Sequence, residues 1–501
     1  MKNASALGVA ALFWLLAGCT VGPNFHRPQA AVPPQWTTPA ARGVSPGVEP
    51  QTDLWWKSFK DPKLDSLIER AVAANYDLKL ATARVDEARA ANGLAKSEYY
   101  PQINGTSSTT RNREFAVAPL PSPGGGVTPK PVAFDLSNFR GAFDASWELD
   151  LFGRIRREVE ASKADLAASE QDRRNVLVTL LGDVGRYYAD LRGFQARLTI
   201  AEQNIATDED TVGLTRSLSN AGQATERDVA QAQAQLESVR AQVPVLKSNI
   251  ATTLHRLSVL TGQQPGALDA ELAEAAPILL VPPDVPAGLP SDLLERRPDI
   301  QRTEAQLAAA TARVGQAIAD YFPRFTLLGT AGHQASQLHD LSLGLGNYFS
   351  VGPSISLPLL TGGRIRSNVA VQDARLKQAA ITYHSTVLAA LEETENALVN
   401  YATEQDRRDR LDAAVSANKT ALELANVQYK AGLSDFLAVL QSERDLAATQ
   451  DLLAQSRASI STDLVALYKA LGGGWSVSPQ TPKHGDEKRF RRVRRWSLES
   501  R

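Results

Sequence analysis

The sequence predicts a mainly α-helical protein with transmembrane β-strands, built from a duplicated unit of helix, β-hairpin, long helix and helix. Three observations predict this fold class. Short motifs recur in the same order in the two halves of the chain, one long stretch carries a coiled-coil stripe, and two segments alternate polar with apolar residues. The chain of 501 residues is long enough to bury a sizeable core.

Residues 1–18 have the pattern of a bacterial lipoprotein signal peptide. Lys2 precedes an apolar run, 7–16, which is too short to span a bilayer as a permanent helix. The run continues into Leu-Ala-Gly and then Cys19, the single cysteine of the chain, so an intrachain disulfide is excluded. We therefore expect a covalent lipid on Cys19 and a lipid-anchored segment over 19–60. A free cysteine in the core is the alternative interpretation.

The two halves of the chain share three motifs. Their spacing is 222 residues for the first motif and 210 for the other two, which places an insertion of 12 residues in the first copy. A Pro/Gly-rich stretch, 119–131, lies at that place and predicts an enlarged hairpin loop, without the Lys-Ser/Thr of a phosphate-binding loop. The first repeat then covers 61–262, a linker 263–290, and the second repeat 291–475. The motif pairs are Ser97–Pro101 with Ala319–Pro323, Gly153–Arg156 with Gly363–Arg366, and Ala221–Gly222 with Ala431–Gly432.

The first repeat contains an unusually long predicted helix, from about 154 to 218. Its apolar residues follow one another at steps of three, four or seven, which is the spacing of a coiled-coil seam. At ~1.5 Å per residue this helix is roughly 95 Å long, a length that no compact globule needs. Its counterpart, 364 to about 430, has a weaker stripe. Two shorter helices, about 62–98 and 225–260, together approach the same length and could lie end to end beside the long one.

Two segments have the period-two pattern of transmembrane strands. From 139 to 151 every odd position is apolar or glycine, while the even positions include arginine, aspartate and glutamate, and 349–359 repeats the alternation. Such strands can cross an outer membrane with one face towards lipid and the other towards water. We expect hairpins at about 100–152 and 323–360. A half-buried strand of a soluble sheet is the alternative, but the flanking helices offer no other sheet for packing.

Each chain would then hold four transmembrane strands. Strands in a bilayer must close into a barrel, because no water is present there to satisfy their edges. Four strands are too few, since about eight strands form the smallest barrels. Several protomers must therefore share one barrel.

These features resemble the TolC/OprM outer-membrane efflux family, in its lipoprotein branch of NodT-type outer-membrane factors. Besides the repeated motifs, family-like stretches include Cys19–Pro23, Trp55-Trp56 with Phe59 and Asp61-Pro62, and Leu294–Ile300. The resemblance covers the chain to about Trp475. It implies a homotrimer, with a 12-stranded barrel in the outer membrane of a Gram-negative bacterium and a 12-helix barrel in the periplasm. It also implies an inner-membrane pump of RND type and a periplasmic adaptor (membrane fusion protein) as partners.

By the same resemblance, the helical turns at Gly222 and Gly432 are hairpin tips at a periplasmic mouth, where the adaptor docks. Glycine permits the positive φ that a tight reversal needs. In this family, contacts among the hairpins hold the mouth shut. Opening requires the inner hairpins to swing outward.

The resemblance assigns a gate to five positions at this mouth. Asp228 and Tyr429 match residues that bond across hairpins, and Leu437 and Arg444 match a hydrophobic ring and a neighbouring arginine at the constriction. The acidic ring of the family falls on Gln441, which carries no charge. We therefore expect weak cation selectivity and a gate closed mainly by Leu437.

The composition gives no support for other functional classes. The formal net charge of −1, with 54 basic and 55 acidic residues, offers no electrostatic case for nucleic acid as a partner. The six histidines are scattered without metal-ligand spacing, so the sequence suggests no metal, no catalytic group and no cofactor besides the lipid on Cys19. An exit duct for drugs or other small toxic compounds is expected; a duct for protein or oligosaccharide secretion and a non-pore coiled-coil lipoprotein are the alternatives. Residues 476–501 are expected to form a basic disordered tail.

Overall fold

The computed structural model describes residues 20–37, 43–46, 53–121, 125, 127–282, 285–343 and 346–475. The chain forms two compact units, each assembled from three stretches of sequence. Among the described residues, the first unit contains those within 20–28, 86–168 and 304–382, and the second contains those within 29–85, 169–303 and 383–475. The predicted signal peptide, Cys19 and the predicted basic tail lie outside the described residues.

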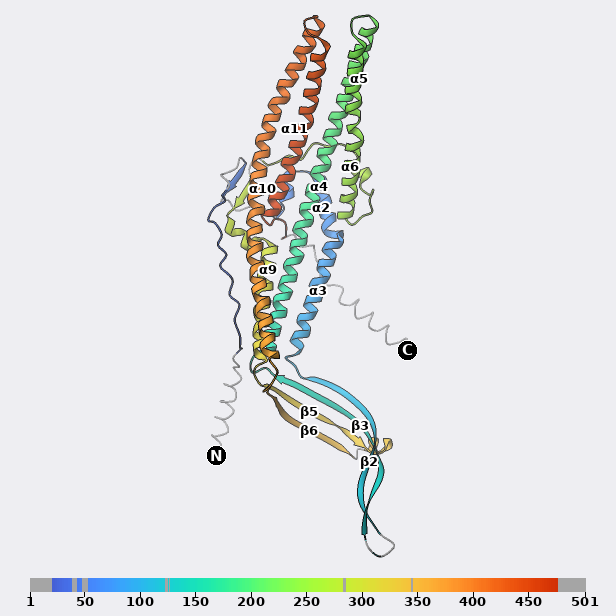
Figure 1. The fold of residues 1–501 in the computed structure, drawn as a ribbon, viewed down its shortest axis with the longest axis vertical. Coiled ribbons are helices and arrows are strands. Elements are labelled where there is room, and N and C mark those ends of the chain that lie inside the picture. The colour runs from blue at the N-terminus through green and yellow to red at the C-terminus, as the bar shows by residue number, and fades with distance from the viewer. Residues whose placement is uncertain are drawn as a thin grey trace. The chain divides into compact units, whose positions relative to one another are not determined.

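The first unit is built on a four-stranded antiparallel sheet (Figure 1). Each half of the chain contributes one hairpin to it, as the repeat predicts, and the two hairpins pair through their inner strands. Within the described residues, each outer strand has only one neighbouring strand, so the sheet has two open edges. The strands, in their order across the sheet, are β2 (Gln102–Pro121), β3 (Val127–Leu149), β5 (Arg324–Ala335) and β6 (Asn347–Ser356).

The two faces of this sheet differ in polarity, which confirms the period-two prediction. Rows of residues that cross the four strands alternate between the faces. Phe143 and Phe349, on the apolar face, are 68% and 82% exposed in the single chain. An apolar row contains Gly105, Phe143, Ala331 and Phe349, and the adjacent polar row contains Asn104, Asp144, Thr330 and Ser350.

The insertion in the first copy lengthens the strands of the hairpin rather than its loop. β2 and β3 remain paired as far as Pro121 and Val127, whereas β5 pairs with β3 only as far as Phe139. Beyond Phe139 the first hairpin continues as a two-stranded ribbon (Figure 1). The prediction of an enlarged loop over 119–131 is therefore wrong. Proline is tolerated here because both strands of a two-stranded ribbon are edge strands.

Long helices make up most of the remaining chain. α4 (Arg154–Asn220) and α10 (Arg364–Lys430) each contain 67 residues, in agreement with the predicted ranges. In the described part of the chain, no helix is long and apolar enough to cross a membrane. The other long helices are α2 (Pro62–Ala74), α3 (Tyr76–Ser97), α5 (Glu226–Arg240), α6 (Gln242–Leu260), α9 (Pro298–Ala319) and α11 (Phe436–Ala470).

Short elements lie between these helices and strands. β1 and β4 form a parallel pair, so the N-terminal segment meets the linker between the repeats. This contact was not predicted from the sequence. The short elements are β1 (Val44–Pro46), η1 (Trp55–Phe59), α7 (Asp269–Leu272), β4 (Val285–Gly288), η2 (Pro290–Asp292), α8 (Leu293–Arg296) and η3 (Leu338–Leu343).

Both of the shorter helices predicted in the first repeat are interrupted. The first breaks at Asn75, whose side-chain amide donates to the carbonyl of Leu260 at 3.0 Å. The second breaks at Ala241, because Pro244 has no N–H to donate to the carbonyl four residues earlier. Through Asn75, the end of α6 meets the break between α2 and α3. The end of α6 thus meets the first predicted helix at its interruption, where α3 begins, and not at the start of α2.

The core of the second unit includes the aromatic residues of η1. Trp55, Trp56 and Phe59 are each no more than 3% exposed. The ring of Trp55 stacks on Tyr468 with 5.5 Å between centroids. A Cβ on Gly185 of α4 would come within 2.7 Å of the Trp55 ring. Glycine is therefore required at this point of the long helix to let the tryptophan pack against it.

Arg297, within the family-like stretch Leu294–Ile300, binds the end of α11 and two carboxylates. Its Nη1 donates to the carbonyl of Ala470 at 2.7 Å, and its Nη2 pairs with Asp299 at 2.8 Å and with Glu393 at 2.7 Å. The last carbonyls of a helix have no partner within the helix. Arg297, which is 8% exposed, supplies one at the end of α11.

Candidate functional site

Both helical hairpins of the second unit turn on a glycine. Gly222 lies between α4 and α5 with φ of 73°, and Gly432 lies between α10 and α11 with φ of 72°. In both turns the following residue donates its N–H back to the helix, from Gln223 to Leu218 and from Leu433 to Gln428, at 2.8 and 2.9 Å. A Cβ on either glycine would meet nothing within 4 Å. Backbone conformation, and not space, therefore selects glycine at these tips.

In the single chain, Asp228 makes its hydrogen bonds within its own hairpin. Its carboxylate forms a capping box with Thr225, accepting from the Thr225 N–H at 2.9 Å and from the hydroxyl at 2.8 Å. These bonds lower the pKa of Asp228. Burial raises the pKa of Tyr429, and the Asp228 charge raises it further. The charge of Asp228 therefore acts on Tyr429. The carboxylate oxygen that would accept a hydrogen bond is already bonded to Thr225 at the start of α5.

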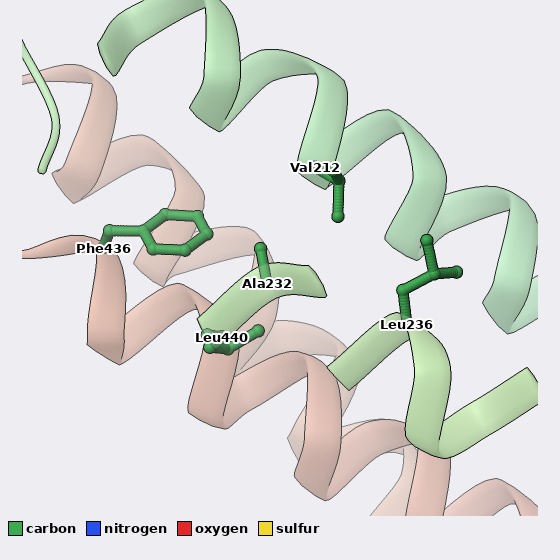
Figure 2. Close-up of a cluster of buried hydrophobic side chains, with 5 residues drawn as sticks. All are labelled: Val212, Ala232, Leu236, Phe436 and Leu440. Carbon is green, nitrogen blue, oxygen red and sulfur yellow. The ribbon is translucent and has the colours of Figure 1, made fainter. Parts of the chain in front are cut away.

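An apolar cluster joins the two hairpins near their tips (Figure 2). Tyr429 is partly buried against it and packs on the ring of Phe436 with 5.8 Å between centroids. Because the cluster draws on both hairpins, separating them would expose it to water. Its members are Val212 from α4, Ala232 and Leu236 from α5, and Phe436 and Leu440 from α11.

Leu437 and Gln441 lie one helical turn apart on α11 and are both exposed. Leu437 is 50% exposed, whereas the neighbouring Leu440 of the cluster is 1% exposed. Gln441 donates its side-chain amide to Asp445 at 2.9 Å. A single chain therefore leaves one apolar side chain and one uncharged amide uncovered on this face of the helix.

Arg444 reaches the first hairpin instead of the uncovered face. Its Nε donates to Oε1 of Gln235 on α5 at 2.8 Å. The five predicted gate residues are thus divided in the structure. Arg444 bonds to the first hairpin, Tyr429 packs against the cluster, and Asp228 belongs to the capping box of α5, while Leu437 and Gln441 are exposed.

The prediction from sequence missed two buried acids beside this cluster, Asp208 on α4 and Glu443 on α11. Burial raises the pKa of Asp208 to about 6 and that of Glu443 to about 7. A signal was present in the sequence. The apolar stripe of α4 steps by seven from Ile205 to Val212, and Asp208 occupies the omitted seam position.

The residues that follow Cys19 are held at the start of α4 in the first unit. Arg157, which is 2% exposed, donates to the carbonyls of Val21 and Gly22 at 3.1 and 3.2 Å. A Cβ on Gly315 would lie 2.7 Å from Nε of Arg157. The glycine therefore leaves room for the arginine that binds this segment.

The sequence matches the family described as outer membrane efflux protein over residues 67–263 and 289–473. It is 31% identical over 468 residues to the solvent efflux pump outer membrane protein SrpC of Pseudomonas putida, covering 93% of this chain and 97% of that protein. It is 33% identical over 482 residues to the pyoverdine export outer membrane protein OpmQ of Pseudomonas aeruginosa, covering 96% and 98%.

Solved structures agree with these matches. The outer-membrane channel OprN superposes with a TM-score of 0.82 at 35% identity, covering 91% of this chain and 100% of that one. The open state of the MtrE outer membrane channel of Neisseria gonorrhoeae gives a TM-score of 0.77 at 27% identity, covering 92% and 100%. The resemblance inferred from the sequence is confirmed: this chain belongs to the outer membrane efflux protein family and is an efflux protein of the Gram-negative outer membrane.

Proposed function

We propose that three copies of this chain form a passive exit duct for small toxic organic compounds. The observation that carries this proposal is the sheet of the first unit, with one apolar face, one polar face and two open edges. A lone sheet of this kind cannot lie in a bilayer, because its edges would have no hydrogen-bond partners. Pairing β2 of one protomer with β6 of the next satisfies both edges, and three protomers complete a 12-stranded barrel.

The names of the relatives support the proposed cargo, because these proteins are named for the efflux or export of solvents, toluene, antibiotics and pyoverdine. The duct would receive such compounds from an inner-membrane pump of RND type through a periplasmic adaptor. Adaptor docking is assigned to the hairpin tips at Gly222 and Gly432. A 12-helix barrel in the periplasm would continue the passage below the membrane.

The gate is assigned to the hairpins that carry these tips. In a trimer, the uncovered Leu437 and Gln441 of each chain would form two rings at the constriction, one apolar and one uncharged. Tyr429, Asp228 and Arg444 would hold the inner hairpin against the outer one in the closed state. A ring of three glutamine amides carries no charge, so this duct would discriminate weakly between cations and anions.

A covalent lipid on Cys19 would complete the attachment to the outer membrane. The support for this is the short segment bound by Arg157, which brings the residues just after Cys19 to the start of α4. The last residues of β3 lie immediately before α4 in the chain, so the lipid would enter the membrane near the periplasmic rim of the barrel.

Two experiments test this function. Purified protein in planar bilayers should give discrete conductance steps, whereas a structural coiled-coil lipoprotein would give none. Deletion of the gene should increase sensitivity to solvents, dyes, detergents and antibiotics. Unchanged sensitivity, together with loss of a secreted protein or oligosaccharide, would refute the cargo proposed here in favour of a secretion duct.

A further inference from the structure

The contact between the two hairpins contains a buried acidic pair beside the apolar cluster. Asp208 on α4 is 6% exposed, and Glu443 on α11 is 9% exposed. One oxygen of each side chain, Oδ2 of Asp208 and Oε2 of Glu443, is buried without a hydrogen-bond partner. A buried carboxylate oxygen without a partner is costly, and a proton removes that cost by removing the charge.

Each helix packed around the pair contributes a polar contact. From α4, Thr211 donates its hydroxyl to Oε1 of Glu443 at 3.1 Å. From α5, Gln235 lies close enough to Asp208 to lower the pKa of that carboxyl, while its Oε1 accepts from Nε of Arg444 on α11. Polar side chains from α4, α5 and α11 therefore surround the two acids.

The charges that act on this pair are few. Arg444 stabilises the Asp208 carboxylate, and the Asp208 charge opposes ionisation of Glu443. In the described parts of α5 and α10, no ionisable side chain contributes to either acid. One arginine, already bonded to Gln235, thus compensates Asp208, and no cation in the described part of the chain contributes to Glu443. A full negative charge on both acids is therefore poorly compensated.

A route for proton exchange lies next to the pair. Gln235 and Arg444, the two residues linked to Asp208, line a cavity of about 410 Å³ between α4, α5 and α11. Its lining is partly polar and also includes Arg197 and Asp451, which pair at 2.7 Å. Water in this cavity would reach the buried network without separation of the helices.

We propose that Asp208 and Glu443 together bind a proton that locks the two hairpins of each protomer together, and that its loss loosens the mouth of the channel. This inference rests on the proposed function, because it adds a control by pH to the same gate. Asp208 lies one turn from Val212 of the apolar cluster, and Glu443 lies three residues from Leu440. Ionisation of the pair therefore acts on the contact that the cluster also stabilises.

The direction of the effect follows from the raised pKa values of about 6 for Asp208 and about 7 for Glu443. A hydrated carboxyl ionises near pH 4, so the packed state holds its protons more tightly than a state in which the hairpins have separated. The two protons stabilise the packed state fully below about pH 4, near the pKa of a hydrated carboxyl. This stabilisation is lost progressively as the pH rises from there through 6 and 7, and the ratio of packed to separated hairpins falls by up to about tenfold for each unit of pKa difference.

The test is the open probability of the reconstituted full-length channel between pH 5.5 and 8. We expect the ratio of open to closed channels to rise by about a hundredfold in the wild type, because over this range the two raised pKa values together change it by about two powers of ten. Glu443→Gln and Asp208→Asn, which keep the shape and remove the charge, should retain the low open probability of acid pH and lose most of the rise. Asp210→Asn is the matched control, because Asp210 is an exposed acid on the same helix. It should follow the wild-type profile.

Thermal melting over the same pH range provides a second measurement that does not need a conducting channel. Between pH 6 and 8 the melting temperature of the wild type should fall further than that of Glu443→Gln. A flat wild-type profile of open probability, or a Glu443→Gln profile identical to the wild type, would overturn the proton lock while leaving the channel function intact. Absence of conductance at every pH would instead refute the channel. The pH dependence of the melting temperature would then show by itself whether Asp208 and Glu443 bind a proton in the packed state.

Discussion

The mutation Leu440→Ala tests whether the apolar cluster holds the two hairpins together. Leu440 is 1% exposed and joins α11 to cluster residues on α4 and α5. Truncation of a buried leucine to alanine costs about 3 kcal/mol, because the transfer free energy is lost and a cavity remains. If the whole cost falls on the closed mouth, the ratio of open to closed channels rises by about a hundredfold, since 1.36 kcal/mol corresponds to a factor of ten.

Single-channel recording of the purified protein in planar bilayers measures this ratio. The matched control is Leu424→Ala on α10, where the same side chain is 56% exposed and outside the cluster. We expect long openings for Leu440→Ala and wild-type behaviour for Leu424→Ala. A Leu440→Ala protein that is folded, assembled and opens no more than the wild type would show that the cluster does not hold the mouth closed.

Three further substitutions test other parts of the argument. Gln441→Asp should make the channel prefer cations in reversal-potential measurements, by adding one carboxylate per protomer; a strong cation preference of the wild type that survives Gln441→Ala would contradict the assignment. Gly315→Ala should displace Arg157 and speed proteolysis within residues 20–28, and an unchanged cleavage rate would mean that the arginine does not hold this segment. Arg297→Leu should lower the free energy of unfolding by about 3 kcal/mol in urea titrations, because Asp299 loses its buried partner; a loss below about 1 kcal/mol would refute the role given to this ion pair.

Local patterns determined the elements of this fold. The alternation over 139–151 predicted a two-faced strand, because side chains of a strand point to opposite faces whatever lies beside them. The spacing of apolar residues predicted α4 to within two residues of its C-terminal end. The tip glycines were recognisable because a positive φ is a property of a single residue.

Where the sequence misled, a longer-range interaction was responsible. The prolines around 119–131 indicated a loop, but pairing between β2 and β3 continues through them because no third strand requires their missing N–H groups. The gate role of Asp228 stays a prediction, because in the single chain its carboxylate accepts from Thr225 at the start of its own helix.

By itself, the sequence determined a duplicated protein with long helices, two strand hairpins and a family membership that three independent motif pairs support. Only the tertiary structure decided which residues meet at the hairpin contact. The place of Asp208 in an apolar seam was a signal that the sequence prediction overlooked, and nothing local indicated that Glu443, far along the chain, would be buried beside it. Such a pair depends on the rotation and register of α11 against α4, which are set by the packing of the whole hairpin and not by any stretch of residues near either acid.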